Sequence, residues 1–243
     1  MPPRPSPTHF LCIPLVTATS RQQLSSSLSS FRADITSLES FGIPDQAIRP
    51  IGTLHLTLGV MSFPKNEGLD KAVALLKTII PRQILADIAA STTGQQAVQR
   101  GEVSGSPPPP LSLTLKGLQT MQSAAKASVL YVPPVYNDTL TKFCEKLRSA
   151  FQEAGLMMEE SRPLLLHATV LNTIYIKGDN SSRRERGRRR EKLTIDARQI
   201  LDRYEDYLWM DNVPVEKIAI CRMGAKKQDD GDEAYEVEAE IDV

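Results

Sequence analysis

Two short stretches of the chain place a threonine two residues after a histidine, inside an apolar run: "GTLHLTLGV" at 52–60 and "LLLHATVLN" at 164–172. The protein has 3 histidines in 243 residues, so two of the three stand in near-copies of one pattern. Residues two apart in a β-strand point to the same face. Each copy therefore predicts an imidazole and a hydroxyl side by side on a strand, His55 with Thr57 and His167 with Thr169.

This doubled arrangement suits acid–base chemistry at a phosphodiester without a metal ion. Imidazoles have an unperturbed pKa of about 6.5, so near neutral pH a neutral ring can accept a proton while a protonated ring gives one to the leaving oxygen. The hydroxyls of Thr57 and Thr169 would donate hydrogen bonds to the non-bridging phosphate oxygens. The residues do not say which histidine is the acid. His9 has no threonine at this spacing, and we expect it to be structural or solvent-exposed.

A single copy is typical of a structural strand, so the repetition carries the prediction. The first copy leaves an apolar face opposite the histidine, and the second does the same; their members are Leu54, Leu56, Leu58 and Val60, and Leu166, Ala168 and Val170. Continued alternation would put Leu171, Thr173 and Tyr175 on the face of His167. Tyr175 is therefore a candidate for contact with a base.

The elements around the two copies alternate between strands and helices. Alternation and apolar runs predict strands over 8–16, 52–63, 111–118, 128–135, 163–176, 215–223 and 234–243. Helical spacing predicts helices over 20–44, 66–80, 137–156 and 194–209, with Pro81 ending or kinking the second. The order suggests an α/β (α+β) protein in which one domain, 8–243, is built from two similar halves. We expect two pseudo-symmetric lobes, each a mostly antiparallel sheet flanked by helices, with a cleft between them.

Two polar stretches interrupt this order. Residues 91–110 are proline-rich and predict a loop or disordered insertion, whose "PPPP" is a linker or a polyproline ligand. Residues 177–192 hold eight Lys/Arg against three Asp/Glu, a local charge of +5. This segment is an RNA-attracting arm, a nuclear import signal or a solvated insertion. The arm hypothesis names Arg183, Arg184, Arg186, Arg188, Arg189 and Arg190 as RNA contacts.

Composition narrows the class of protein. The formal net charge is zero, so contact with nucleic acid must come from a local patch. The three cysteines are far apart and predict small buried thiols in a reducing compartment, nuclear or cytoplasmic, with no metal or other cofactor. No apolar run approaches the ~20 residues that span a bilayer, so we expect no membrane partner.

The paired motifs resemble those of the 2H phosphoesterase superfamily, which includes LigT-type 2′-5′ RNA ligases and cyclic phosphodiesterases. The stretches "RPIGTLHLTLGVM", "LSLTLKGLQTM", "VLYVPPV", "LLLHATVLNTIY" and "VPVEKIAICRMGA" are similar to the A-kinase-anchor-type 2′-5′ RNA ligase-like domain. That domain also occurs in the small subunit of the activating signal cointegrator complex. The resemblance implies a bilobal fold whose cleft is lined by the two histidines and two threonines. It implies either a metal-independent phosphodiesterase acting on RNA or nucleotides, or a non-catalytic nucleotide-binding subunit of a coactivator or repair complex.

Overall fold

The computed structural model describes residues 5–96, 110–159, 162–176, 193–229 and 231–243. The helices are α1 (Arg21–Thr36), α2 (Leu69–Thr78), α3 (Pro81–Gln96), α4 (Asp138–Glu153) and α5 (Arg198–Arg203). The longer strands are β1 (His9–Pro14), β2 (His55–Met61), β3 (Ser112–Lys116), β5 (Val129–Val132), β6 (Ala168–Asn172), β7 (Leu208–Pro214), β8 (Lys217–Arg222) and β11 (Val237–Asp242). Three two-residue strands complete the set: β4 (Gln119–Thr120), β9 (Lys226–Lys227) and β10 (Glu233–Ala234).

The strands form separate sheets, and every ladder between them is antiparallel. One sheet has the order β11-β8-β1-β2, a second has β4-β5-β6, β3 pairs with β7, and β9 pairs with β10. The mixed α/β architecture with mostly antiparallel sheets is therefore confirmed. The two HxT strands belong to different sheets, because β2 ends the first and β6 ends the second.

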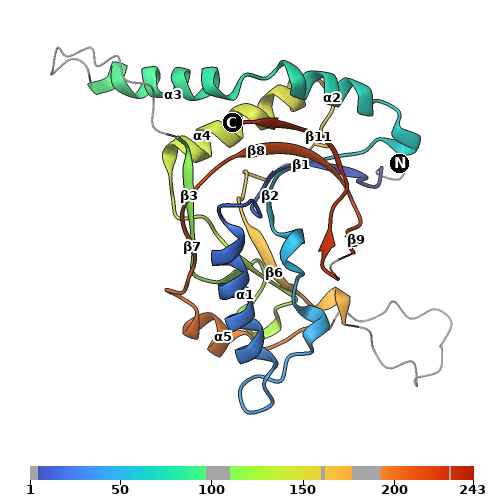
Figure 1. Ribbon diagram of the computed structural model, residues 1–243, viewed down its shortest axis with the longest axis vertical. Helices are drawn as coiled ribbons and strands as arrows, with labels where there is room; N and C mark the ends of the chain where they lie inside the picture. Colours follow the sequence, from blue (N-terminus) through green and yellow to red (C-terminus); the bar gives the residue numbers. More distant parts are fainter. Residues whose placement is uncertain (1–4, 97–109, 160–161, 177–192, 230) are drawn as a thin grey trace.

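The sheets are not built from the two halves of the sequence. The four-stranded sheet joins β1 and β2, near one end of the chain, to β8 and β11, near the other. Figure 1 shows this sheet with α2, α3 and α4 beside it, while α1 and α5 lie at the opposite end of the molecule. This sheet therefore combines strands from both ends of the chain, because ladder pairing does not require nearness in sequence.

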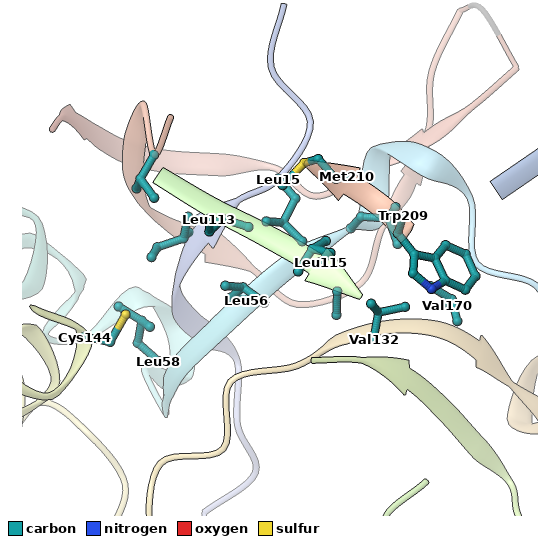
Figure 2. Packing of buried hydrophobic residues seen from close by; sticks show 14 of the residues in the cluster. Leu15, Leu56, Leu58, Leu113, Leu115, Val132, Cys144, Val170, Trp209 and Met210 are labelled. Carbon is teal, nitrogen blue, oxygen red and sulfur yellow. The ribbon is translucent and has the colours of Figure 1, made fainter. Parts of the chain in front are cut away.

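The apolar faces of the two HxT strands share one core. Leu56 and Leu58 of β2 are 0% and 1% exposed, and Val170 of β6 is 1% exposed. Figure 2 shows them gathered with side chains from β3, β5 and β7, among which Leu113 and Trp209 are labelled. The core therefore supports both strands from behind and leaves the faces that carry the histidines outside it.

The helices cover this core with the faces that their spacing predicts. Leu24, Leu28, Phe31 and Ile35 of α1 are buried. Leu38 is 93% exposed because α1 ends at Thr36. The α4 helix starts as predicted, with the Asn137 side chain accepting a hydrogen bond from the Leu140 backbone N–H at 3.1 Å.

Four sequence predictions differ from the structure. The helix expected over 194–209 shrinks to α5, and Leu208 and Trp209 open β7, which pairs with β3. The strand expected over 163–176 is only β6, followed by the 3-10 helix η5 (Thr173–Tyr175). Pro81, expected to end or kink the second helix, is the first residue of α3, because proline is favoured in a first helical turn. That helix continues to Gln96 into the stretch expected to be a loop.

Candidate functional site

A short piece of chain ties the two HxT strands together. Ile48 forms an antiparallel bridge with Leu171 of β6, and the Arg49 N–H donates to the Val170 carbonyl at 2.9 Å. The chain then passes through the 3-10 helix η2 (Ile51–Thr53) and enters β2 at His55. Strands β2 and β6 also contact each other directly. The second motif strand thus anchors the segment that leads into the first.

The two histidines make the same backbone hydrogen bond. Nδ1 of His55 lies 2.7 Å from the Thr53 carbonyl oxygen, and Nδ1 of His167 lies 2.8 Å from the Leu165 carbonyl oxygen. A carbonyl oxygen only accepts, so each Nδ1 must carry the hydrogen. This fixes the tautomer of both neutral rings and leaves Nε2 as the atom that can exchange a proton with a ligand.

Both motif strands also carry a β-bulge at the same place. Thr57 faces Cys12 and Gly59 faces Leu11, so Leu58 is the extra residue in β2. Thr169 faces Tyr131 and Leu171 faces Leu130, so Val170 is the extra residue in β6. A bulge bends its strand and re-aims the side chains beside it. The bulge also explains why Leu171 is buried, against the prediction that it would share the face of His167.

The surroundings of the two imidazoles differ. The His55 ring packs against Phe10 and Tyr235, with ring centroids 4.7 Å and 5.2 Å away. Although part of its surface is exposed, the ring is densely surrounded by protein, and this burial lowers the pKa of His55 to about 4. The positive charges of His167 and Arg49 lower this pKa further, while the hydrogen bond to Thr53 opposes the shift. His167 thus lies within electrostatic range of His55.

His167 has fewer neighbours of this kind. Its ring meets Tyr131 edge-on at 5.3 Å. The Leu165 residue whose carbonyl it binds is 48% exposed. Thr57 and Thr169 are both half-buried, each two residues beyond its histidine. The structure therefore brings together all four predicted motif residues on two strands in contact.

A cavity of ≈ 390 Å³ opens beside His55 on the outer face of the four-stranded sheet. Its wall includes Phe10, Tyr235 and the thiols of Cys12 and Cys221, which lie 3.8 Å apart. The contact with Cys221 and burial raise the pKa of Cys12, so this thiol stays protonated. All three cysteines are buried and unbridged, as the sequence predicts for small buried thiols.

Tyr235 reaches His55 because a hairpin docks on a glycine. The Gly52 N–H donates to the Asp232 carboxylate at 2.9 Å. A Cβ at this position would lie 2.6 Å from the Glu233 carbonyl oxygen, so only glycine permits the approach. This contact holds the β9–β10 hairpin against the segment before β2 and sets Tyr235 beside the imidazole.

Arg49 is a residue of this region that the sequence analysis missed. It is 5% exposed, its guanidinium carbon lies 4.1 Å from the centre of the Tyr175 ring, and its side chain hydrogen-bonds Tyr235. Its sequence context, "IRPIGT", reads as a loop, and the only local signal is a charge set between isoleucines. The burial arises from the bridge between Ile48 and Leu171, which no local pattern reveals.

The remaining predicted site residues have different outcomes. Tyr175 ends η5, beyond the strand that would have set it on the face of His167, so that route to the site is wrong. It meets the region through Arg49 instead. The arginines at 183, 184, 186, 188, 189 and 190, with the whole 177–192 insertion, lie outside the described residues, as do 97–109 of the proline-rich stretch.

The described residues can also be compared with what a metal site or a membrane span requires. Among them, no group of three or more His, Cys, Asp or Glu side chains is placed to hold a metal ion. Within the same residues, no helix has the length and hydropathy to cross a membrane.

Comparison with known proteins places this geometry in a family. Residues 7–243 match the family model described as the AKAP7 2′5′ RNA ligase-like domain. An uncharacterized protein of Schizosaccharomyces pombe is 33% identical over 172 residues, which cover 70% of this chain and 68% of that protein. Activating signal cointegrator 1 complex subunit 1 of Mus musculus is 24% identical over 165 residues, 63% of this chain but only 41% of the mouse protein.

Solved structures share the fold at low sequence identity. A crystal structure from Thermus thermophilus aligns with a TM-score of 0.50 and 14% identity, covering 97% of both chains. Escherichia coli LigT, crystallised with NADP+, aligns with a TM-score of 0.50 and 16% identity, covering 98% of both chains. At these identities the likeness concerns the fold.

Proposed function

The chain belongs to the AKAP7 2′5′ RNA ligase-like domain family, and from this premise we propose that it is a metal-independent phosphodiesterase. Its substrates are RNA or nucleotide phosphodiesters, either a 2′,3′-cyclic phosphate or a 2′-5′ linkage. The observation that carries the proposal is the repetition of one local geometry on two strands in contact. In both copies Nδ1 is held by a backbone carbonyl and a bulge follows the threonine. A structural histidine has no need of this duplication.

The repeated geometry supports a two-proton mechanism. With a 2′,3′-cyclic phosphate bound between the strands, one Nε2 takes a proton from water as the water oxygen attacks phosphorus. The bond from phosphorus to one ribose oxygen breaks, and the other Nε2 gives that oxygen its proton. The product is a phosphomonoester, and proton exchange with solvent restores both rings. The Thr57 and Thr169 hydroxyls donate hydrogen bonds to the non-bridging oxygens, where negative charge accumulates.

The surroundings of the rings suggest which histidine does which. His55, whose pKa burial lowers to about 4, is neutral near pH 7, so its Nε2 has a free lone pair and serves as the base. His167, which contacts a single aromatic ring, is then left to serve as the acid. The direction of the substrate across the two strands follows from this assignment.

Turnover under chelation tests the proposal. The protein is incubated with adenosine 2′,3′-cyclic phosphate and with 2′-5′-linked oligoadenylate in excess EDTA, and products are separated by chromatography. We expect hydrolysis of at least one substrate by the wild type and none by the doubly substituted His55→Gln, His167→Gln variant. Each histidine is expected to contribute roughly 10²- to 10⁴-fold in rate. Equal turnover by the wild type and the double variant would contradict the proposal.

A second candidate follows from the mouse relative. Activating signal cointegrator 1 complex subunit 1 is named as part of a complex, and this chain matches 41% of it. On this hypothesis the protein is a non-catalytic RNA- or nucleotide-binding subunit of a coactivator or repair complex. The protein would then bind nucleotide without hydrolysing the cyclic phosphate or the 2′-5′-linked oligoadenylate. The histidine variants would lose affinity for the nucleotide rather than turnover.

A further inference from the structure

Arg49 carries a positive charge in a buried position. It is 5% exposed, and within the described ranges no carboxylate forms an ion pair with it. Its neighbours are the Tyr175 ring, 4.1 Å from the guanidinium carbon, and the neutral hydroxyl of Tyr235. Burial of a charge is costly unless it is paired, and aromatic and neutral hydrogen-bonding neighbours compensate only part of that cost.

Arg203 shows how the charge of an arginine stacked on a ring is ordinarily balanced. Arg203 also lies over an aromatic ring, with its guanidinium carbon 4.6 Å from the centre of Phe41. Unlike Arg49, it is paired with a carboxylate, since its Nη1 lies 2.6 Å from Asp34 Oδ1. Arg203 is also half-exposed, at 52% for its side chain. Arg49 is therefore the more deeply buried of the two arginines, and it has no carboxylate partner among the described residues.

Arg49 lines a cavity of ≈ 690 Å³ between α1, residues 45–51 and the 227–233 hairpin. Tyr175 and Lys227 also line it. Of the acidic residues in its wall, Asp45 pairs with Arg32, and Asp232 accepts the Gly52 N–H. The Glu233 carboxylate lines the cavity without forming an ion pair with Arg49. The cavity is thus large enough for a phosphate group beside a guanidinium that has donors to spare.

Arg49 also lies close to the HxT pair. Its backbone is bonded to Val170, the residue after Thr169, and its side chain bonds Tyr235, whose ring touches His55. An anion on Arg49 would therefore lie in the same region as a phosphate held by the two motifs.

We propose that Arg49 binds a second phosphate of the substrate, so that the site prefers ligands with a phosphate on both sides of one ribose, such as an oligonucleotide, over mononucleotides. This inference rests on the proposed function, because it requires the first phosphate to occupy the HxT pair. The guanidinium engages the second phosphate through two parallel N–H···O bonds, and Tyr175 holds its plane from one side.

Paired ligands test the inference. Binding of adenosine 3′-monophosphate and adenosine 3′,5′-bisphosphate to the full chain is measured by calorimetry at one fixed ionic strength. We expect the wild type to bind the bisphosphate about 10- to 100-fold more tightly, the range for a charged hydrogen-bonded contact. Arg49→Met removes that preference, because it lowers the affinity for the bisphosphate far more than the affinity for the monophosphate. Arg49→Lys, which retains charge but not the two-pronged geometry, recovers part of it.

Arg203→Met is the matched control, since it removes an arginine that also stacks on a ring but lines neither cavity. It should leave the preference unchanged. Equal affinities of the wild type for the two ligands would overturn the inference but leave the proposed function intact, and this comparison needs no variant to fold. Absence of binding by either ligand would instead contradict the proposed function, and the inference with it. A preference that survives in Arg49→Met would assign the second phosphate to another group.

Discussion

The two HxT strands are alike in backbone and unlike in environment. Each histidine donates Nδ1–H to the carbonyl two residues before it, and each threonine is followed by a bulge. Yet His55 contacts two aromatic rings and is near a buried arginine, whereas His167 contacts one ring. The motif therefore repeats the geometry of proton transfer, and the surroundings differentiate the two rings.

This difference indicates how a near-symmetric site acquires a direction. Two identical imidazoles would accept a substrate in either orientation with equal ease. On the proposed mechanism, lowering the proton affinity of one ring by burial assigns that ring as the base and the other as the acid. Three predictions test whether the contrast between β2 and β6 has this meaning.

The largest effect concerns the leaving group. His55→Gln and His167→Gln should each lower kcat/KM on a cyclic nucleotide by roughly 10²- to 10⁴-fold. A nucleoside phosphate ester with a nitrophenyl leaving group needs no acid, so it should restore turnover to His167→Gln and not to His55→Gln. Steady-state rates on both substrates give the answer. Rescue of His55→Gln instead would exchange the roles of the two residues.

The second-largest effect concerns how the free energy of unfolding depends on pH. The pKa of His55 is about 4 in the folded protein and about 6.5 when unfolded, so between these values the unfolded chain binds more protons. The stability contributed by neutral His55 is therefore complete above pH 6.5 and is lost as pH falls toward 4, by at most about 3 kcal/mol.

Urea unfolding at pH 7, 5.5 and 4.5 measures this loss. His55→Gln should flatten the dependence on pH, and His167→Gln should flatten it much less, because burial, the main cause of the low pKa of His55, remains in that variant. Burial also lowers the pKa of His9, so a smaller slope of the same sign remains in His55→Gln. An unchanged slope in that variant would mean that His55 is not the buried neutral ring described above.

The smallest effect tests the aromatic shell. Tyr235→Ala should admit water to His55 and raise the pKa of this ring. The rising limb of the pH–rate profile should then move to higher pH by about one unit, so that the rate at acidic pH falls ~10-fold. Tyr131→Ala, at the corresponding place beside His167, should leave this limb where it is. Tyr235→Phe keeps the ring and serves as the control. Equal shifts for the two alanine variants would remove the distinction between the strands.

The strands that carry the histidines were predictable because their signal is local. Leucine alternation predicted β2 and its buried face, and the helix expected from residue 137 begins at Asp138, with Asn137 as its cap. The pairing of the two motifs depended only on repetition, and the structure brings the strands into contact. The proposed chemistry follows from residue types that the sequence displays openly.

The missed features all depend on contacts between distant segments. The helix expected over 194–209 included Leu208 and Trp209, but these residues open β7 because β3 offers a partner. Arg49 appears as a loop residue until the bridge between Ile48 and Leu171 buries it. The bulges in β2 and β6 depend on the pairing register with a neighbouring strand, which the sequence of one strand does not specify. The bulge in β6 turned the Leu171 side chain into the core.

The position of β1 between β2 and β8 determines when the sheet can be completed during translation. Cys12 of β1 and Cys221 of β8 are 209 residues apart, yet their strands are neighbours. A ribosome that adds 5–20 residues each second takes about 10 to 40 s to travel between them. Throughout that interval β1 can pair with β2 but keeps one hydrogen-bonding edge unfilled. The wall around His55 is therefore finished late, so a nascent chain holds both motifs well before it holds a site.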